Sequence, residues 1–214
     1  SADDAAVKLL YKRQTSPQGL LQFMKKIQKQ NALNGIEESD YFRTHPVTSE
    51  RVRFLEQAVK QSPYHQDHSL DSEFQRIKAK LYGFLQEPAQ TFKRYPPSDT
   101  SIAARYAQAI AYFKQLNFGK ALRMIDVLSA EEPDNPYFYE LKAQIYMEQG
   151  NLKAAKEAYG KVLKLRPDAA LLQVDWAQAA LAVSPSPAEL KNIIAVLNRS
   201  LQQRPSAIGW LLLS

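Results

Sequence analysis

The sequence predicts an all-α protein whose C-terminal half is a stack of helix pairs. No segment alternates between apolar and polar residues over the length of a strand, whereas apolar residues recur at helical spacing along most of the chain. The residues before Asp134 also match the residues after it at a constant shift of 34 positions. Four structurally demanding positions pair at this shift: Ala109 with Ala143, Tyr112 with Tyr146, Ala121 with Ala155, and Pro133 with Pro167.

The clearest unit spans residues 134–168 and predicts two helices with a turn at Gly150 and Asn151. Small alanines allow the two helices to approach closely, tyrosines fill the space around them, and Pro167 ends the second helix. This spacing resembles that of a tetratricopeptide repeat, whose period is about 34 residues. A third, less faithful copy ends at Pro205, later than this period predicts, so we expect about four inserted residues at 184–187.

The N-terminal half predicts separate amphipathic helices. A short helix is expected over residues 3–13, and a second begins after Ser16 and Pro17, a favourable cap followed by a proline. A third begins near Thr48. The helix expected over residues 70–86 places four apolar residues on one face, which we predict to point inward: Phe74, Ile77, Leu81 and Phe84 (or Leu85).

Composition excludes several classes of protein. The net charge of +6 is divided evenly between the two halves of the chain, without a basic patch, so nucleic acid is not an expected partner. There is no cysteine for a disulfide or a thiolate metal site, and no apolar run long enough to span a membrane. We expect both ends to be cuts in a longer protein, because the chain enters directly into a helix and stops in an apolar run.

Residues 40–51, with the sequence DYFRTHPVTSER, carry a second motif. The R-T-H-P-x-T-x-E-R string resembles one in bacterial periplasmic zinc metallopeptidases of the HExxH class that have C-terminal tetratricopeptide repeats. The strings SPQGLLQF (16–23), RIKAKLYGFL (76–85) and NPYFYELK (135–142) are similar to the same family. The resemblance implies a metalloendopeptidase of envelope protein quality control, located in the periplasm, with protein substrates.

In that family, zinc is held by two histidines of HExxH and a glutamate. HExxH is absent here, so zinc is expected in the parent protein and not in this fragment, which should have no peptidase activity and no catalytic residue. The resemblance carries over one residue, His45, as an inhibitory zinc ligand at the open position of the metal. From the residues alone, His45 is a loop histidine whose following Pro46 fixes an extended turn. His65 and His68 flank Asp67 and suit either a metal site or, more simply, a solvated loop.

The predicted organisation has three parts. Residues 1–62 form a helical remnant of the peptidase domain that includes the His-Pro loop, and residues 63–98 form linking helices. Residues 99–214 form the repeats, at about 101–134, 135–168 and 169–206, with a fourth starting at 207–214.

The first helix of each repeat should line a concave groove that binds proteins or peptides. Its predicted lining residues, mostly aromatic and apolar, are Tyr106, Ile110, Phe113, Tyr137, Glu140, Gln144, Met147 and Gln178, with Leu181 beside them. A clamp for a peptide carboxylate is not expected, because Ile110 and Gln144 stand where such clamps use Lys and Asn. The apolar end at 210–213 should self-associate or pack back on the third repeat. A free-standing tetratricopeptide adaptor, with no peptidase in the parent, is the alternative function.

Overall fold

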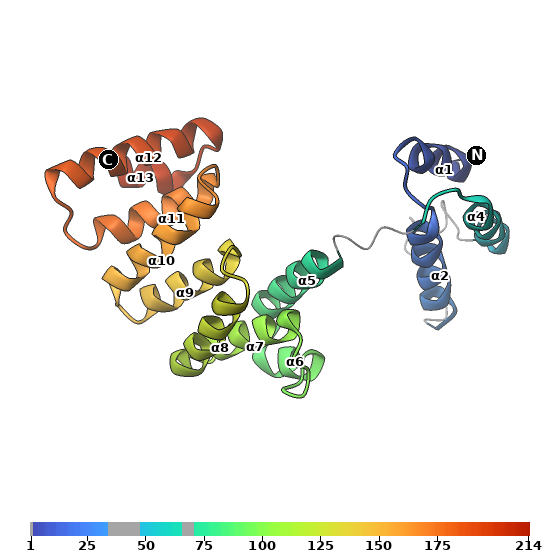
Figure 1. The fold of residues 1–214 in the computed structure, drawn as a ribbon, viewed down its shortest axis with the longest axis horizontal. Helices are drawn as coiled ribbons and strands as arrows, with labels where there is room; N and C mark the ends of the chain where they lie inside the picture. The colour runs from blue at the N-terminus through green and yellow to red at the C-terminus, as the bar shows by residue number, and fades with distance from the viewer. Residues whose placement is uncertain (1, 34–47, 66–70) are drawn as a thin grey trace. The chain divides into compact units, whose positions relative to one another are not determined.

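The computed structural model describes residues 2–33, 48–65 and 71–214, and it contains only helices in these ranges. They divide into two compact units, residues 1–71 and 72–214, each described here by itself. The all-α prediction is therefore confirmed (Figure 1).

The N-terminal unit contains α1 (Ala2–Lys12), α2 (Gln18–Leu33) and α4 (Ser49–Gln61), and α4 packs on both of the others. As expected, Ser16 caps α2 by accepting a hydrogen bond from Gln18 N, and Thr48 caps α4 by accepting one from Arg51 N. The buried apolar residues of this unit come from all three helices: Val7, Leu21, Val52, Leu55 and Ala58.

The second unit begins with two helices that precede the repeats, α5 (Asp71–Leu85) and α6 (Pro88–Arg94). The first repeat is α7 (Ile102–Lys114) with α8 (Phe118–Glu131), and the second is α9 (Pro136–Glu148) with α10 (Leu152–Leu165). The third is α11 (Ala170–Leu181) with α12 (Pro187–Gln203), followed by α13 (Ala207–Leu213). From α7 to α13, each helix packs on the next along the chain (Figure 1).

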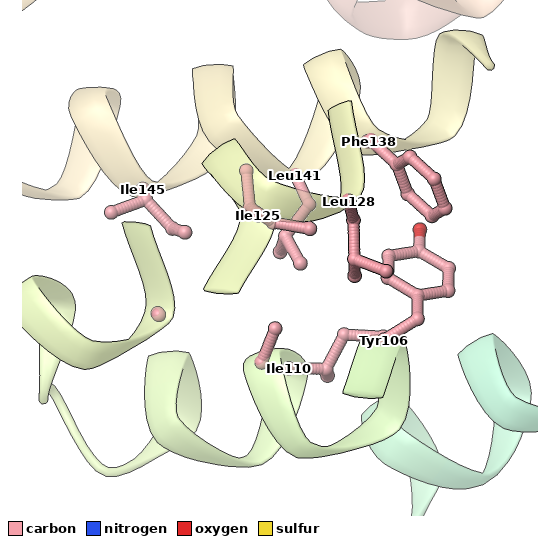
Figure 2. Close-up of a cluster of buried hydrophobic side chains, with 9 residues drawn as sticks. Tyr106, Ile110, Ile125, Leu128, Phe138, Leu141 and Ile145 are labelled. Carbon is pink, nitrogen blue, oxygen red and sulfur yellow. The ribbon is translucent and has the colours of Figure 1, made fainter. Parts of the chain in front are cut away.

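The core of the first repeat extends into the second, which is why these two repeats stack. Tyr106 and Ile110 of α7 meet Ile125 and Leu128 of α8, and Leu141 of α9 closes the cluster (Figure 2). The ring of Tyr106 also packs edge-on against Phe138, with centroids 5.1 Å apart. A repeat therefore buries its apolar face only with a neighbour's help.

The turn inside each repeat recurs at the same period in all three copies. The residue in this turn has a left-handed backbone each time, with φ of 58° at Leu116, 72° at Gly150 and 54° at Ser184. Only Gly150 adopts this conformation without steric cost. The first helix of the third repeat is therefore in register with the others.

The insertion in the third repeat differs from the sequence prediction. The step from the N-cap Asn151 to the N-cap Ser186 is only one residue longer than the step from Asn117 to Asn151, so the turn holds a single extra residue. The remainder lengthens α12, which has 17 residues where α10 has 14. Placing all four residues at 184–187 was wrong, because a capping box between Ser186 and Glu189 starts α12 immediately after that turn.

The predicted inward face of α5 was wrong except at Phe84, which packs against the core of the first repeat. Its large apolar residues are mostly solvent-exposed: Phe74 (57%), Ile77 (52%), Leu81 (55%) and Leu85 (75%), with Phe84 half-buried. The buried face of α5 consists instead of its small residues, Ala79 and Gly83. Small side chains allow a closer helix contact than an apolar pattern alone predicts.

The C-terminal end packs back on the third repeat. Leu212 and Leu213 contact the cluster around Val174 and Ile193, while Trp210 and Leu211 remain 61% and 72% exposed. Self-association through this end stays a prediction.

Candidate protein-binding site

α5 lies across the first helix of the first repeat and is held there by close backbone approach. Ala79 is fully buried against Ala104 and Ala107 of α7. A Cβ added at Gly83 would lie 3.1 Å from the Cβ of Ile110, so only glycine fits this contact without a shift. α5 therefore covers the face of α7 that corresponds to the groove in the second repeat.

Two ion pairs connect α5 to the repeats, one to the end of the first repeat and one to the second. Lys80 Nζ lies 2.6 Å from the carboxylate of Glu140 and 4.7 Å from the ring centroid of Tyr137, and Arg76 pairs with Glu132 at 2.9 Å. The four side chains are between 13% and 27% exposed, so solvent screens the two ion pairs only in part.

A lysine of α7 holds the other end of α5. Lys114 Nζ donates hydrogen bonds to the backbone oxygens of Phe84 and Gln86, where α5 ends. The last carbonyls of a helix lack partners within the helix, and a positive charge suits that end of the helix dipole. α5 is thus fixed along its length by small-residue packing, two ion pairs and this cap.

The prediction that Tyr106 and Ile110 line an open groove is therefore wrong, because both are buried. Tyr106 is 1% exposed and Ile110 is fully buried, because α5 and the core of the first repeat enclose them. Tyr106 donates a hydrogen bond to the backbone oxygen of Tyr137, and burial raises its pKa far above the ordinary value. The third residue of this repeat, Phe113, is half-buried against Phe118.

α5 also reaches the second repeat through Lys80, which pairs with Glu140 and lies over the ring of Tyr137, but the predicted residues there remain partly exposed. Tyr137 is 40% exposed, and Glu140, Gln144 and Met147 are half-buried on the same helix. In the third repeat Gln178 is exposed and Leu181 is half-buried against the C-terminal cluster. Whether these residues bind a protein stays a prediction.

A pocket of about 850 Å³ lies where α5 meets the start of α9. Its lining combines apolar and aromatic side chains with six charged ones. The lining residues are Glu73, Arg76, Ile77, Lys80, Leu81, Tyr106, Glu132, Pro133, Asp134, Asn135, Pro136, Tyr137, Phe138 and Arg166.

The sequence interpretation missed most of this pocket. It assigned α5 to a linker, so Arg76, Lys80 and Leu81 were not considered as binding residues. It also missed Leu171, which is 48% exposed and stands one repeat period after Tyr137. The repeat period alone would have identified Leu171, whereas no sequence signal places α5 beside α9.

One acidic group on α11 has a displaced titration. Asp175 is half-buried and lies near Glu140, and burial, followed by the repulsion from Glu140, raises the pKa of its carboxyl to about 6.

In the N-terminal unit, α1 and α4 are joined by a bidentate ion pair. Arg51 donates from Nε and Nη2 to the two carboxylate oxygens of Asp3, both at 2.8 Å. These hydrogen bonds lower the pKa of Asp3. The first turn of α4 is therefore tied to the first turn of α1.

The predicted metal-site residues lie largely outside the described part of the chain. His45 falls there, as do Asp67 and His68, while His65 is exposed. Within residues 2–33, 48–65 and 71–214, no group of three or more His, Cys, Asp or Glu side chains is placed to hold a metal ion. In the same ranges, no helix is both long and apolar enough to cross a membrane.

Comparison with protein families finds one match in the N-terminal unit and one in the repeats. Residues 1–59 match the model of peptidase family M48, and residues 136–169 match a tetratricopeptide repeat. No curated protein matches the chain. The chain thus joins a segment similar to peptidase family M48 to tetratricopeptide repeats, which suggest protein–protein interaction.

Proposed function

We propose that this chain is the region of a zinc-dependent metalloendopeptidase that binds substrate or partner proteins, and that the enzyme acts in periplasmic protein quality control. The observation that carries the proposal is the coexistence, in one chain, of an M48 segment and a repeat array with an open aromatic pocket. A free-standing adaptor without a peptidase would not need residues 1–59.

The pocket suits apolar segments that folded proteins bury. Its lining includes Tyr137, Phe138 and Leu81. Two of its basic residues, Arg76 and Lys80, are already paired with acidic residues of the chain. Misfolded and unassembled proteins expose apolar segments of this kind. An exposed aromatic pocket on a rigid helical array can therefore select such proteins without reading a particular sequence.

Zinc does not fit the described residues, since they contain no suitable cluster of His, Cys, Asp or Glu side chains. The family is generally zinc-dependent, so the metal belongs to the proposed whole enzyme. His45 stays our candidate for an inhibitory ligand. It precedes α4 in the sequence, and the first turn of α4 is joined to the first turn of α1 by Asp3 and Arg51.

Binding of fluorescein-labelled casein, a permanently unfolded protein, tests the proposal. We expect Tyr137→Ala to weaken binding about tenfold, since an aromatic anchor in a pocket often supplies that much. Val127→Ala is the control, because Val127 is 51% exposed but lies on α8, outside the pocket. Equal binding by both variants and the parent chain would contradict the proposed site.

The regulatory role of His45 needs the enzyme with its complete peptidase domain. His45→Ala should retain or increase the cleavage of casein, because an inhibitory ligand is lost while the catalytic groups remain. A His45→Ala enzyme that binds zinc normally and is as inactive as a variant lacking the glutamate of HExxH would overturn this role.

A further inference from the structure

The outer face of α5 is an apolar stripe without a partner in the described structure. Phe74, Ile77, Leu81 and Leu85 follow one another at intervals of three, four and four residues, which places them along one side of the helix. Each is more than half exposed. Together they offer on the order of 400 Å² of apolar surface, the size at which a patch on a monomer is commonly functional.

The stripe cannot turn inward. The opposite side of α5 is occupied by the buried contact of Ala79 with α7 and by the contact of Gly83 with Ile110. Rotating the helix would also break the ion pairs of Arg76 with Glu132 and of Lys80 with Glu140. The exposure of the stripe is therefore a fixed feature of this unit.

The stripe continues into the pocket. Ile77 and Leu81 belong to both, and the opposite wall of the pocket is formed by Pro136 and Tyr137 at the start of α9. The stripe and the pocket therefore form one continuous apolar track along α5, and the pocket is the deeper part of this track.

The charges around this track favour a partner with an acidic flank. Arg76 and Lys80 are neutralised by Glu132 and Glu140, so they leave no strong net charge at the pocket. Lys78 lies over the ring of Phe74 at 5.4 Å, so its positive charge borders the stripe, whereas the exposed Glu73 lines the pocket. An acidic residue next to the apolar face of a partner would meet Lys78.

We propose that α5 and the adjoining pocket bind an amphipathic helix of another protein, with an apolar face and an acidic flank. The proposal rests on the proposed protein-binding function and names the form of the partner. A helix satisfies its own backbone hydrogen bonds, whereas an extended peptide on an apolar stripe leaves N–H and C=O groups unpaired. A second copy of this chain fits less well, because the stripe offers about half of the roughly 800 Å² that each partner buries in a standard interface.

The test uses two synthetic 14-residue peptides labelled with fluorescein. One is stapled as a helix, with Leu at positions 1, 4, 8 and 11 and Glu beside them; the other has the same composition with two central prolines and no staple. Fluorescence anisotropy should show binding of the helical peptide and at least tenfold weaker binding of the proline peptide.

Variants of the chain locate the site. Ile77→Glu combined with Leu81→Glu should weaken binding of the helical peptide at least tenfold, and Lys78→Glu should weaken it severalfold. Leu190→Glu, an exposed leucine on α12, should change binding less than twofold. Circular dichroism verifies that each variant keeps its helix content, which is expected because all four positions are exposed.

Three results would overturn the proposal. The proline peptide could bind as tightly as the helical one, the stripe variant could bind as tightly as the parent chain, or sedimentation velocity could show a dimer that only the stripe variant loses. In the last case a second copy occupies the stripe. If casein binding still depends on Tyr137 in any of these cases, the proposed function stands and only the identity of the partner fails.

Discussion

The first and second repeats carry equivalent positions that have opposite environments. Ile110 and Gln144 are one repeat period apart and occupy the same place on the first helix of their repeats. Ile110 is fully buried, partly against α5, whereas Gln144 on α9 is partly exposed. The repeat register therefore predicts which face a residue occupies, and the helix outside the register decides whether that face is free to bind.

The largest expected effect separates these two positions directly. Ile110→Ala should lower the free energy of unfolding by about 2–4 kcal/mol, because it leaves a cavity between α5 and the core. Gln144→Ala should change it by less than about 0.5 kcal/mol, since it removes a partly exposed side chain. Urea denaturation followed by circular dichroism measures both, and similar losses would show that α5 does not enclose Ile110.

The contact of α5 can be broken from its own side. Gly83→Leu should lower the stability by about 1–3 kcal/mol, because even a Cβ at this position is 3.1 Å from Ile110. Gly119→Leu is the matched control: its Cβ would meet only the mobile end of Arg123 at 3.5 Å. A Gly83→Leu chain that melts with the Gly119→Leu chain would mean that α5 is not packed on α7.

The third repeat should show a pH dependence of stability that comes from Asp175 on α11. The pKa of Asp175 is about 6 in the folded chain, above its ordinary value of 3.8. A carboxyl with a raised pKa binds its proton more tightly when folded, so its contribution to stability falls as pH rises from about 4 to 6 and stays low above that.

Asp175→Asn removes this loss. It should stabilise the chain by about 1–2 kcal/mol at pH 7 and have little effect at pH 4. Thermal melts of the variant and the parent chain at both pH values provide the measurement. A variant that stabilises the chain equally at pH 4 and pH 7 would show that Asp175 titrates normally.

The turns inside the repeats give the smallest contrast. Gly150→Ala should cost about 1 kcal/mol, because φ is 72° there although no atom lies within 4 Å of the added Cβ. Leu116→Gly, at the equivalent turn of the first repeat, should stabilise by up to about 1 kcal/mol for the same reason in reverse. Shifts of the same sign in both variants would argue against a shared left-handed turn.

Much of the repeat fold could be predicted from residues whose roles are local. Pairs such as Ala121 with Ala155 and Pro133 with Pro167 report close helix contacts and helix ends, and these requirements recur once in every repeat. The same logic explains the caps at Ser16 and Thr48. Local requirements leave a mark in the sequence because few residue types meet them.

The candidate site was less predictable because it depends on contacts between distant segments. An apolar pattern on α5 suggested that Phe74, Ile77 and Leu81 are buried, but Ala79 and Gly83 make the actual contact. The ion pair of Lys80 with Glu140 joins residues 60 positions apart, and a sequence read alone does not distinguish it from two solvated charges. The covering of the first repeat was missed for this reason.

Thiol labelling tests the central claim, that α5 covers the first repeat and leaves the second open, most directly. The chain has no cysteine, so Ile110→Cys and Gln144→Cys each introduce a single thiol. We expect 5,5′-dithiobis(2-nitrobenzoate) to react with Gln144→Cys at least a hundredfold faster than with Ile110→Cys, and the Gly83→Leu change to accelerate only the latter. Equal rates at the two positions in the otherwise unchanged chain would contradict the account.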